Sequence, residues 1–304
     1  MSEMIWILTG PTASGKTDLS LELAERYGCE IVCMDSMQIY RGMDIGTAKP
    51  TAAEQARARH HMLDICDPRD AYSVAQWVED ACACIRDIRA RGKRALLVGG
   101  TGFYLRALRH PMAMGDVPAD PAIRGELERQ AALPGGKDAL HRQLADADPV
   151  TAARLHVNDV RRVIRALEVY RSTGVPFSRQ RQETAPPPFP SRCAALTMPR
   201  ETLYRRIDLR VEKMLEAGLA REVKRLLDSG VPEDSQSMKG LGYKELIPYL
   251  RGETDLDTAK AAIQQGSRHY AKRQLTWLRA EKDLLWAESG AQIEAFFAGQ
   301  AEEA

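Results

Sequence analysis

Short apolar runs alternate with helical stripes along the first hundred residues of this chain. The runs 4–8, 31–34 and 95–98 are almost wholly apolar, which is typical of strands buried on both faces. Apolar residues spaced three and four apart follow the first run and precede the third, and these helices are expected to end at Gly28 and Gly92. The alternation predicts an α/β fold with a central parallel sheet flanked by helices.

A helical pattern without intervening strands begins near residue 113. Asp120 and Pro121 form an N-cap and first-turn pair for a helix to Ala132, and a second helix is predicted over 158–173. A proline-rich connector at 185–190 leads back to a strand and further long helices. We therefore predict a catalytic core formed by 1–112 and 187–290, a helical insertion domain over 113–186, and a loosely held tail over 291–304.

A complete phosphate-binding loop directly follows the first apolar run. In this motif backbone amides surround a phosphate, Lys16 adds a positive charge, and the Thr17 hydroxyl can hold Mg²⁺. The loop predicts a P-loop NTPase-like core and a ligand that carries phosphate. The expected contacts are Gly10, Pro11, Thr12, Ala13, Ser14, Gly15, Lys16 and Thr17.

The second and third apolar runs also end in residues that are suited to chemistry. Asp35 follows the run 31–34, and Thr101 follows the run 95–98. Because ligands bind at the carboxyl ends of parallel strands, the P-loop, Asp35 and Thr101 are expected to form one site. Asp35 can be interpreted as a magnesium ligand, a general base or a turn residue, and the Gln38 amide is suited to an adenine edge.

Composition and charge add little that is specific to this picture. The net charge of +1 does not indicate a nucleic-acid binder, and the six cysteines lack metal spacing, which predicts a reduced, cytoplasmic chain without structural zinc. No apolar run approaches the roughly 20 residues of a membrane helix. Arginines gather over 154–181, and basic residues alternate with aromatic ones over 268–282. Both clusters are typical of solvated helix surfaces and also of surfaces that bind RNA.

The ordered set of motifs resembles the bacterial tRNA dimethylallyltransferase family, also called tRNA isopentenyltransferases. The similarity spans roughly residues 4 to 286. This resemblance implies transfer of a dimethylallyl group from dimethylallyl diphosphate to N6 of adenosine 37, in tRNAs that read codons beginning with U. It also implies that the P-loop holds the diphosphate of the prenyl donor. The matching blocks are 10–17, 35–40, 46–50, 60–65, 72–75, 99–104, 158–170, 208–214, 242–245 and 270–279.

The resemblance further implies roles for individual residues. Asp35 would accept a proton from the attacking amine, while Lys16, Thr101 and Arg210 would bind the departing diphosphate, and Thr17 would help to hold Mg²⁺. The partners would be dimethylallyl diphosphate and the anticodon stem-loop of tRNA, bound by a monomer. The implied tRNA contacts are Asp35, Ser36, Met37, Gln38, Thr101, Arg124, Asp159, Val160, Arg161, Arg162, Val163, Gly240, Leu241, Gly242, Tyr243, Lys244, Glu245, Arg273, Gln274 and Trp277.

Two alternatives remain open from the residues themselves. A P-loop kinase of a nucleoside or small metabolite would use the insertion as a lid and consume ATP. A nucleotide-gated RNA-binding protein would use the loop only as a switch. Transfer of a prenyl group to RNA separates the transferase from both.

Overall fold

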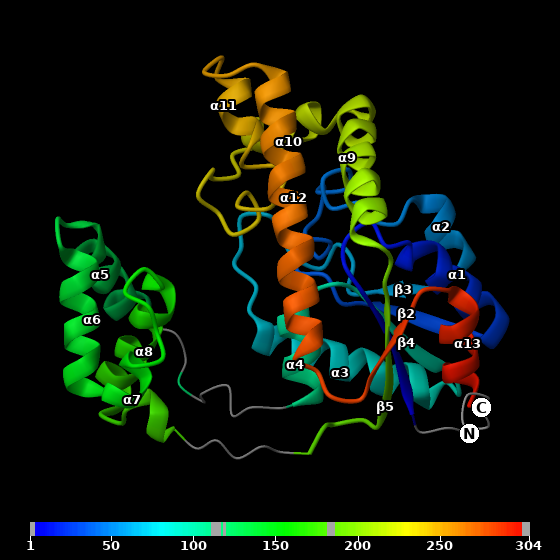
Figure 1. The fold of residues 1–304 in the computed structure, drawn as a ribbon, viewed down its shortest axis with the longest axis horizontal. Helices are drawn as coiled ribbons and strands as arrows, with labels where there is room; N and C mark the ends of the chain where they lie inside the picture. Colours follow the sequence, from blue (N-terminus) through cyan, green and yellow to red (C-terminus); the bar gives the residue numbers. More distant parts are fainter. Residues whose placement is uncertain (1–3, 111–116, 118–119, 181–185, 300–304) are drawn as a thin grey trace. The chain divides into compact units, whose positions relative to one another are not determined.

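The chain folds into two compact units (Figure 1). The computed structural model describes residues 4–110, 117, 120–180 and 186–299. One unit combines Met1–Arg109 with Pro187–Ala304, and the other is His110–Pro186. The second unit corresponds to the helical insertion predicted over 113–186.

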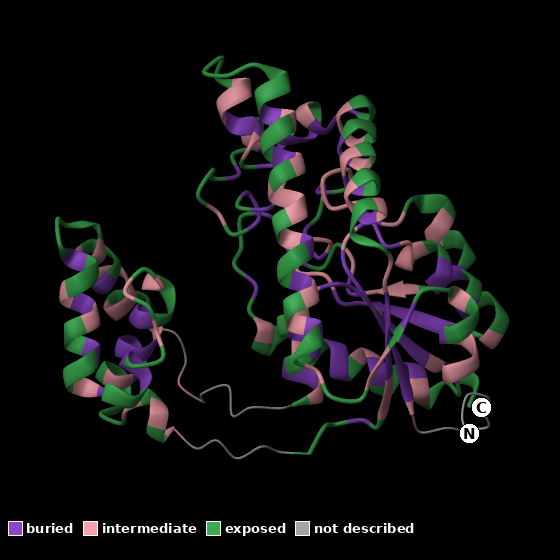
Figure 2. Cartoon of the chain, viewed as in Figure 1, coloured by how far each residue is buried: buried purple, intermediate pink, exposed green. Residues whose placement is uncertain are grey.

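A six-stranded parallel sheet, with strand order β3-β2-β4-β1-β5-β6, forms the centre of the first unit. Every residue of β1 and β2 is buried, which explains the apolar runs 4–8 and 31–34 in the sequence (Figure 2). The sequence did not indicate β3, which has only two residues, or β6, whose first three residues are not fully buried. The strands are β1 (Ile5–Thr9), β2 (Cys29–Cys33), β3 (His60–His61), β4 (Arg94–Val98), β5 (Ser191–Leu196) and β6 (Leu284–Ala287).

Successive residues of β1, β4 and β5 face two different hydrophobic cores. On β1, Ile5 and Ile7 pack into the core that includes residues of α3 and α4, whereas Trp6 and Leu8 pack into the core shared with α1 and α13. No helix in the described part of the chain is long and apolar enough to cross a membrane. The helices of this unit are α1 (Lys16–Tyr27), α2 (Ala52–Arg57), α3 (Val74–Ala90), α4 (Gly102–Arg109), α9 (Arg200–Ala217), α10 (Leu219–Asp228), α11 (Leu246–Leu250), α12 (Leu256–Arg279) and α13 (Gly290–Ala298).

Helix α13 corrects the prediction of a loosely held tail over 291–304. The side chain of Ser289 accepts a hydrogen bond from the amide of Gln292, and Gln292 completes the capping box. Phe297 is buried, and its ring stacks on Trp6 with centroids 5.0 Å apart. The prediction is therefore wrong as far as Ala298, and residues 300–304 lie outside the described part of the chain.

The second unit is a small helical bundle with its own core. Leu127, Leu140, Leu144, Val163 and Leu167 are buried together there. The sequence predicted the first and last long helices but not the one between them, which begins after a glycine with no side-chain cap. The elements are α5 (Pro121–Ala132), α6 (Gly136–Ala147), α7 (Pro149–Ala152), α8 (Val160–Thr173) and a 3₁₀ helix, η1 (Phe177–Arg179).

Candidate active site

A cavity of about 1100 Å³ opens where β1, β2 and β4 end. Its lining includes the P-loop from Thr12 to Thr17, Asp35 after β2, and Gly99 and Gly100 after β4. These strands are neighbours in the sheet, so their carboxyl ends meet at one edge. The predicted convergence of the three strand ends is confirmed for the P-loop and Asp35.

The P-loop has the backbone geometry of an anion site. Gly10 has φ of 140°, and a Cβ there would lie 2.5 Å from the carbonyl oxygen of Leu196, so only glycine fits. Helix α1 begins directly after Gly15, and no side chain caps its first turn. The amides of that turn are therefore available to a bound phosphate.

Lys16 stands at the centre of this loop. Its Nζ donates hydrogen bonds to the carbonyl oxygens of Gly10 (2.9 Å) and Pro11 (2.6 Å). The pKa of Lys16 is lowered to about 7, mainly by burial and also by the nearby cation of Arg210, while Asp35 opposes this shift. The free site thus holds a lysine whose charge depends on pH near neutrality.

Helix α9 adds Arg206 and Lys213, two cations that the sequence did not single out. Together with the predicted Arg210, they line the cavity from one face of the helix. Arg206 Nε donates to the carbonyl oxygen of Ala13 (2.8 Å), which ties the helix to the P-loop. Burial lowers the pKa of Arg210, while neighbouring Asp35 raises it. The spacing of four and three residues was visible in the sequence and could have identified the whole stripe.

Asp35 both stabilises a turn and faces the cavities. Its Oδ1 accepts a hydrogen bond from the amide of Met37 (2.8 Å), as the turn interpretation predicted. No donor within the described chain hydrogen-bonds to Oδ2. One oxygen thus holds the loop, while the other is available for a ligand.

A second cavity, of about 280 Å³, meets the first. Both linings include Thr12, Asp35, Arg210 and Tyr270. The second cavity is closed by the segment from Lys239 to Lys244, by Ser36 and Met37, and by Arg273. The carboxylate and the guanidinium therefore stand at the junction of two binding spaces, which is the arrangement that a group transfer needs.

Thr101 lies behind this junction rather than on its surface. Its Oγ1 accepts a hydrogen bond from the amide of Ser36 (3.1 Å), and its own amide donates to Met34 (3.3 Å). Among the described residues, the lining of the first cavity includes Gly99 and that of the second includes Ser36, but neither includes Thr101. The structure thus shows Thr101 positioning the Asp35 loop, and its contact with diphosphate stays a prediction.

Two glutamines predicted to contact RNA hold loops together. Gln38 Nε2 donates to the carbonyl oxygens of Thr47 and Ala48, both at 3.1 Å. Both amide hydrogens are thereby used within the chain, and the predicted two-point contact with an adenine edge stays a prediction. Gln274 is buried, and it accepts from the amide of Thr12 (2.8 Å) and donates to Gly100 (2.9 Å). Gln274 thus joins the P-loop to the loop after β4, and its predicted contact with tRNA stays a prediction.

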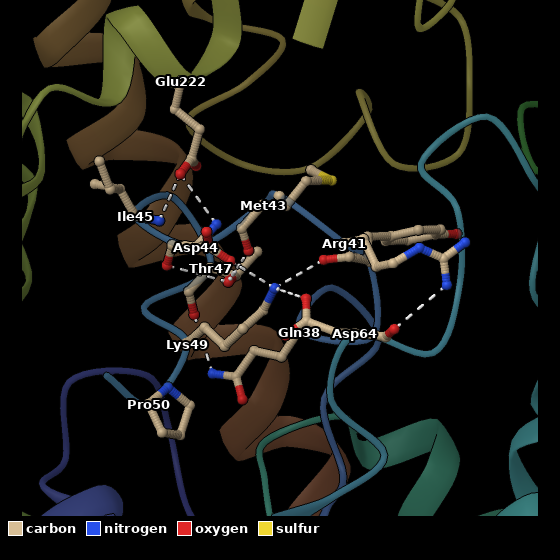
Figure 3. Close-up of polar contacts among 12 residues, drawn as sticks. Gln38, Arg41, Met43, Asp44, Ile45, Thr47, Lys49, Pro50, Asp64 and Glu222 are labelled. Carbon is tan, nitrogen blue, oxygen red and sulfur yellow. Dashed lines mark hydrogen bonds and ion pairs between the residues drawn. The ribbon is translucent and has the colours of Figure 1, made fainter. Parts of the chain in front are cut away.

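Glu222 of α10, which the sequence reading missed, holds the loop that borders both cavities (Figure 3). Its Oε2 accepts hydrogen bonds from the amides of Asp44 (3.0 Å) and Ile45 (2.9 Å), and Oε1 accepts from Gly46 (3.2 Å). Oε1 also accepts from the Tyr243 hydroxyl (2.7 Å). Tyr243 is largely buried and its segment lines the second cavity, so the predicted contact of this segment with tRNA stays a prediction.

Lys49 fixes the other end of the same loop (Figure 3). Its buried Nζ donates to the carbonyl oxygen of Tyr40 (2.8 Å) and to carboxylate oxygens of Asp44 (2.7 Å) and Asp64 (2.5 Å). Such a fully bonded ammonium group stabilises one loop conformation and leaves no isolated buried charge. The wall of the cavity is therefore built before any ligand binds.

We expect Glu222→Gln to lower the free energy of unfolding by about 2–4 kcal/mol, because an amide nitrogen would face backbone donors that now bond to a carboxylate. Tyr243→Phe should cost less, about 1 kcal/mol, since it removes one of these hydrogen bonds. Guanidinium denaturation measures both. Glu216→Gln, at an exposed position on α9, is the matched control. Equal stabilities of Glu222→Gln and Glu216→Gln would contradict the role assigned to Glu222.

The predicted tRNA contacts of the insertion belong to the second unit. Arg124 and Arg165 both donate to the fully buried carboxylate of Glu168, at 2.8 and 2.9 Å. Arg161 and Arg162 are exposed on α8, whereas the side chain of Val163 is buried in the core of the unit, and the predicted tRNA contact of this stretch stays a prediction. Helix α8 thus has an exposed cationic side, with Arg161 and Arg162, and a side that packs inside the unit.

The site offers Mg²⁺ few ligands of its own. Among the described residues no group of three or more histidines, cysteines or acids could hold a metal ion. Thr17 and Asp35 do line the same cavity. Mg²⁺ commonly takes one or two protein oxygens together with substrate phosphates and waters, so these two side chains fit a metal that arrives with its ligand.

Comparison with known families gives matches over residues 3–281. The family model described as IPP transferase matches residues 38–281, and the one described as isopentenyl transferase matches residues 3–68. A protein of Shouchella clausii named tRNA dimethylallyltransferase is 49% identical over 284 residues, which cover 93% of this chain and 91% of that protein.

Two solved structures share the fold of this chain. A crystal structure of the tRNA isopentenylpyrophosphate transferase of Bacillus halodurans covers 99% of this chain, with 42% identity, a TM-score of 0.72 and 98% of its own chain matched. A structure of a eukaryotic dimethylallyltransferase acting on tRNA also covers 99% of this chain, with 29% identity, a TM-score of 0.79 and 78% of that chain matched.

Proposed function

The chain belongs to the tRNA isopentenyltransferase family, and we propose that it transfers a dimethylallyl group from dimethylallyl diphosphate to N6 of adenosine 37 in tRNA. The acceptors would be tRNAs that read codons beginning with U, modified in the cytoplasm by a monomer. The observation that carries this proposal is the junction of two cavities at Asp35 and Arg210. Neither the kinase nor the RNA-binding switch is supported by the relatives, which are named as transferases.

The larger cavity suits the prenyl donor. Departure of diphosphate builds negative charge, and fixed cations at that point stabilise the transition state more than the ground state. Lys16, Arg206 and Arg210 surround the P-loop end of this cavity, and the first-turn amides of α1 lie beside them. Mg²⁺ would be held by Thr17 and would neutralise part of the diphosphate charge. These groups would retain the leaving group while the allylic carbon is attacked.

The smaller cavity suits the acceptor base. An adenine amine is a weak nucleophile, so a carboxylate that accepts its proton lowers the barrier. Asp35 Oδ2 is available at the junction of the cavities, whereas Oδ1 is held by the turn. The base would have to leave the stack of the anticodon loop to reach this oxygen. Tyr270, whose pKa is raised by burial, keeps its hydroxyl proton and could donate it to a ligand.

Mass spectrometry of an unmodified anticodon stem-loop, incubated with the protein and dimethylallyl diphosphate, tests the function directly. We expect the RNA to gain the mass of one dimethylallyl group at adenosine 37 and diphosphate to be released. An RNA in which adenosine 37 is replaced by guanosine is the control. Consumption of ATP without any gain in RNA mass would support the kinase instead.

We expect binding of dimethylallyl diphosphate to take up a proton above pH 7. In the free protein Lys16 has a pKa of about 7, and a bound anion favours its charged form, so its pKa should rise in the complex. Affinity for the donor should therefore fall as pH rises from 7 to 9, by at most about tenfold per pH unit. Isothermal titration calorimetry at pH 8, in buffers that differ in ionisation enthalpy, measures the number of protons taken up when the donor binds.

Lys16→Arg is the matched control for this titration, because arginine stays charged throughout this range. Its proton uptake should be smaller than that of the unchanged protein. Equal proton uptake by the two proteins would contradict the assignment to Lys16.

A further inference from the structure

A third cavity of the first unit is separate from the two that meet at Asp35. It has a volume of about 560 Å³ and lies between the start of α9, the C-terminal half of α12 and β6. None of its lining residues also lines either of the other cavities. A ligand bound there would be additional to the prenyl donor and the acceptor base.

Three cations surround this cavity without an acidic partner. Arg200, Lys272 and Arg279 are exposed, and within the described chain none of them forms an ion pair. The lining includes no aspartate or glutamate. The chain as a whole has 43 basic and 42 acidic residues, so this concentration of unpaired positive charge departs from its average. A positive, concave surface of this kind attracts an anion such as phosphate.

The floor and walls of the cavity are apolar and aromatic. Leu203 is buried, and Met198 and Leu275 pack beside it. The guanidinium of Arg200 lies 5.0 Å from the ring centroid of Tyr204. Trp286 keeps 37% of its surface exposed. Flat aromatic faces next to cations are the elements with which proteins stack single nucleic-acid bases.

We propose that this cavity binds a nucleotide, with its base against Tyr204 and Trp286 and its phosphate near Arg200 and Lys272. The volume falls within the range of about 300–1,000 Å³ that small-ligand sites have. A phosphate alone would leave the aromatic floor unused, and an apolar ligand would leave the three cations unused. A free nucleotide and one nucleotide of an RNA strand offer the same chemistry, so the experiment separates the two sources.

Binding is measured on full-length protein that carries Lys16→Ala, because this substitution weakens binding of the probe's phosphate at the P-loop. Equilibrium dialysis with AMP tests the free nucleotide, and filter binding of a 5′-phosphorylated single-stranded RNA hexamer tests the strand. The expected result is saturable binding in at least one arm. Trp286→Ala should weaken it about tenfold, and Arg200→Glu with Lys272→Glu at least tenfold.

Arg86→Glu, an exposed arginine of α3 outside all three cavities, is the matched control and should change affinity less than twofold. Equal melting temperatures confirm that the variants fold. Binding of AMP would assign the cavity to free nucleotides, and binding of the RNA alone would assign it to a strand. The proposal is overturned if neither probe binds below 1 mM, or if the cavity variants bind as the control does. Prenyl transfer is not measured here, so a failure would leave the proposed reaction untouched.

Discussion

Asp35→Asn should lower kcat by about 10²–10⁴ while leaving the affinity for tRNA within about twofold of the unchanged protein. The two side chains have the same shape, and asparagine retains the Oδ1 acceptor that the amide of Met37 uses. The turn should therefore remain, while the oxygen that accepts the proton is replaced by an NH₂ group. Single-turnover prenyl transfer gives the rate, and filter binding of the stem-loop gives the affinity.

Asp35→Ala separates the two functions of this carboxylate. It removes the proton acceptor and also the turn acceptor, so it should lose tRNA affinity as well as rate. Asp234→Asn, at an exposed position outside both reaction cavities, is the matched control. If Asp35→Asn weakened tRNA binding as much as it slowed transfer, the carboxylate would be structural and the assigned chemistry would be wrong.

The fold was largely predictable because its strands are buried on both faces. Such strands read as uninterrupted apolar runs, and the P-loop marks the turn after the first of them. The elements that were missed are stabilised by tertiary contacts. Only the last residue of β6 is fully buried, and α13 depends on Phe297 stacking against Trp6. No local pattern reports a partner that lies nearly three hundred residues away.

The charged residues of the site could be predicted from the sequence, but the roles of its glutamine side chains could not. Lys16 and Asp35 follow strands, so the parallel topology alone brings them to one edge. In the sequence, Gln38 and Gln274 resemble residues that recognise a ligand. A glutamine that binds a ligand and a glutamine that holds two loops together cannot be distinguished by residue type. Glu222 was missed for the related reason that a carboxylate on an amphipathic helix normally faces water. Only the folded chain shows which polar groups are satisfied internally.

Arg210→Ala should lower kcat by about 10²–10³, which corresponds to the roughly 2.7–4 kcal/mol lost when one fixed donor to a developing anion is removed. Arg210 is close enough to lower the pKa of Lys16 and lies at the junction of the cavities, so the charge of departing diphosphate would form beside it. Arg210→Lys should recover only part of the loss, because an ammonium group lacks the planar pair of donors. Arg205→Ala, on the same helix with its side chain exposed and outside both cavities, is the matched control.

The variant Arg210→Ala also tests Lys16 in a second, independent way. Because the cation of Arg210 is one of the causes that lower the pKa of Lys16, its removal should let that pKa rise. The pH at which affinity for dimethylallyl diphosphate begins to fall should then move upward from about 7, even as turnover collapses. A residue that merely supported the fold would change both pH behaviour and melting temperature together. An unmoved pH profile, in a variant that melts like the unchanged protein, would place Arg210 too far from Lys16 to share a diphosphate with it.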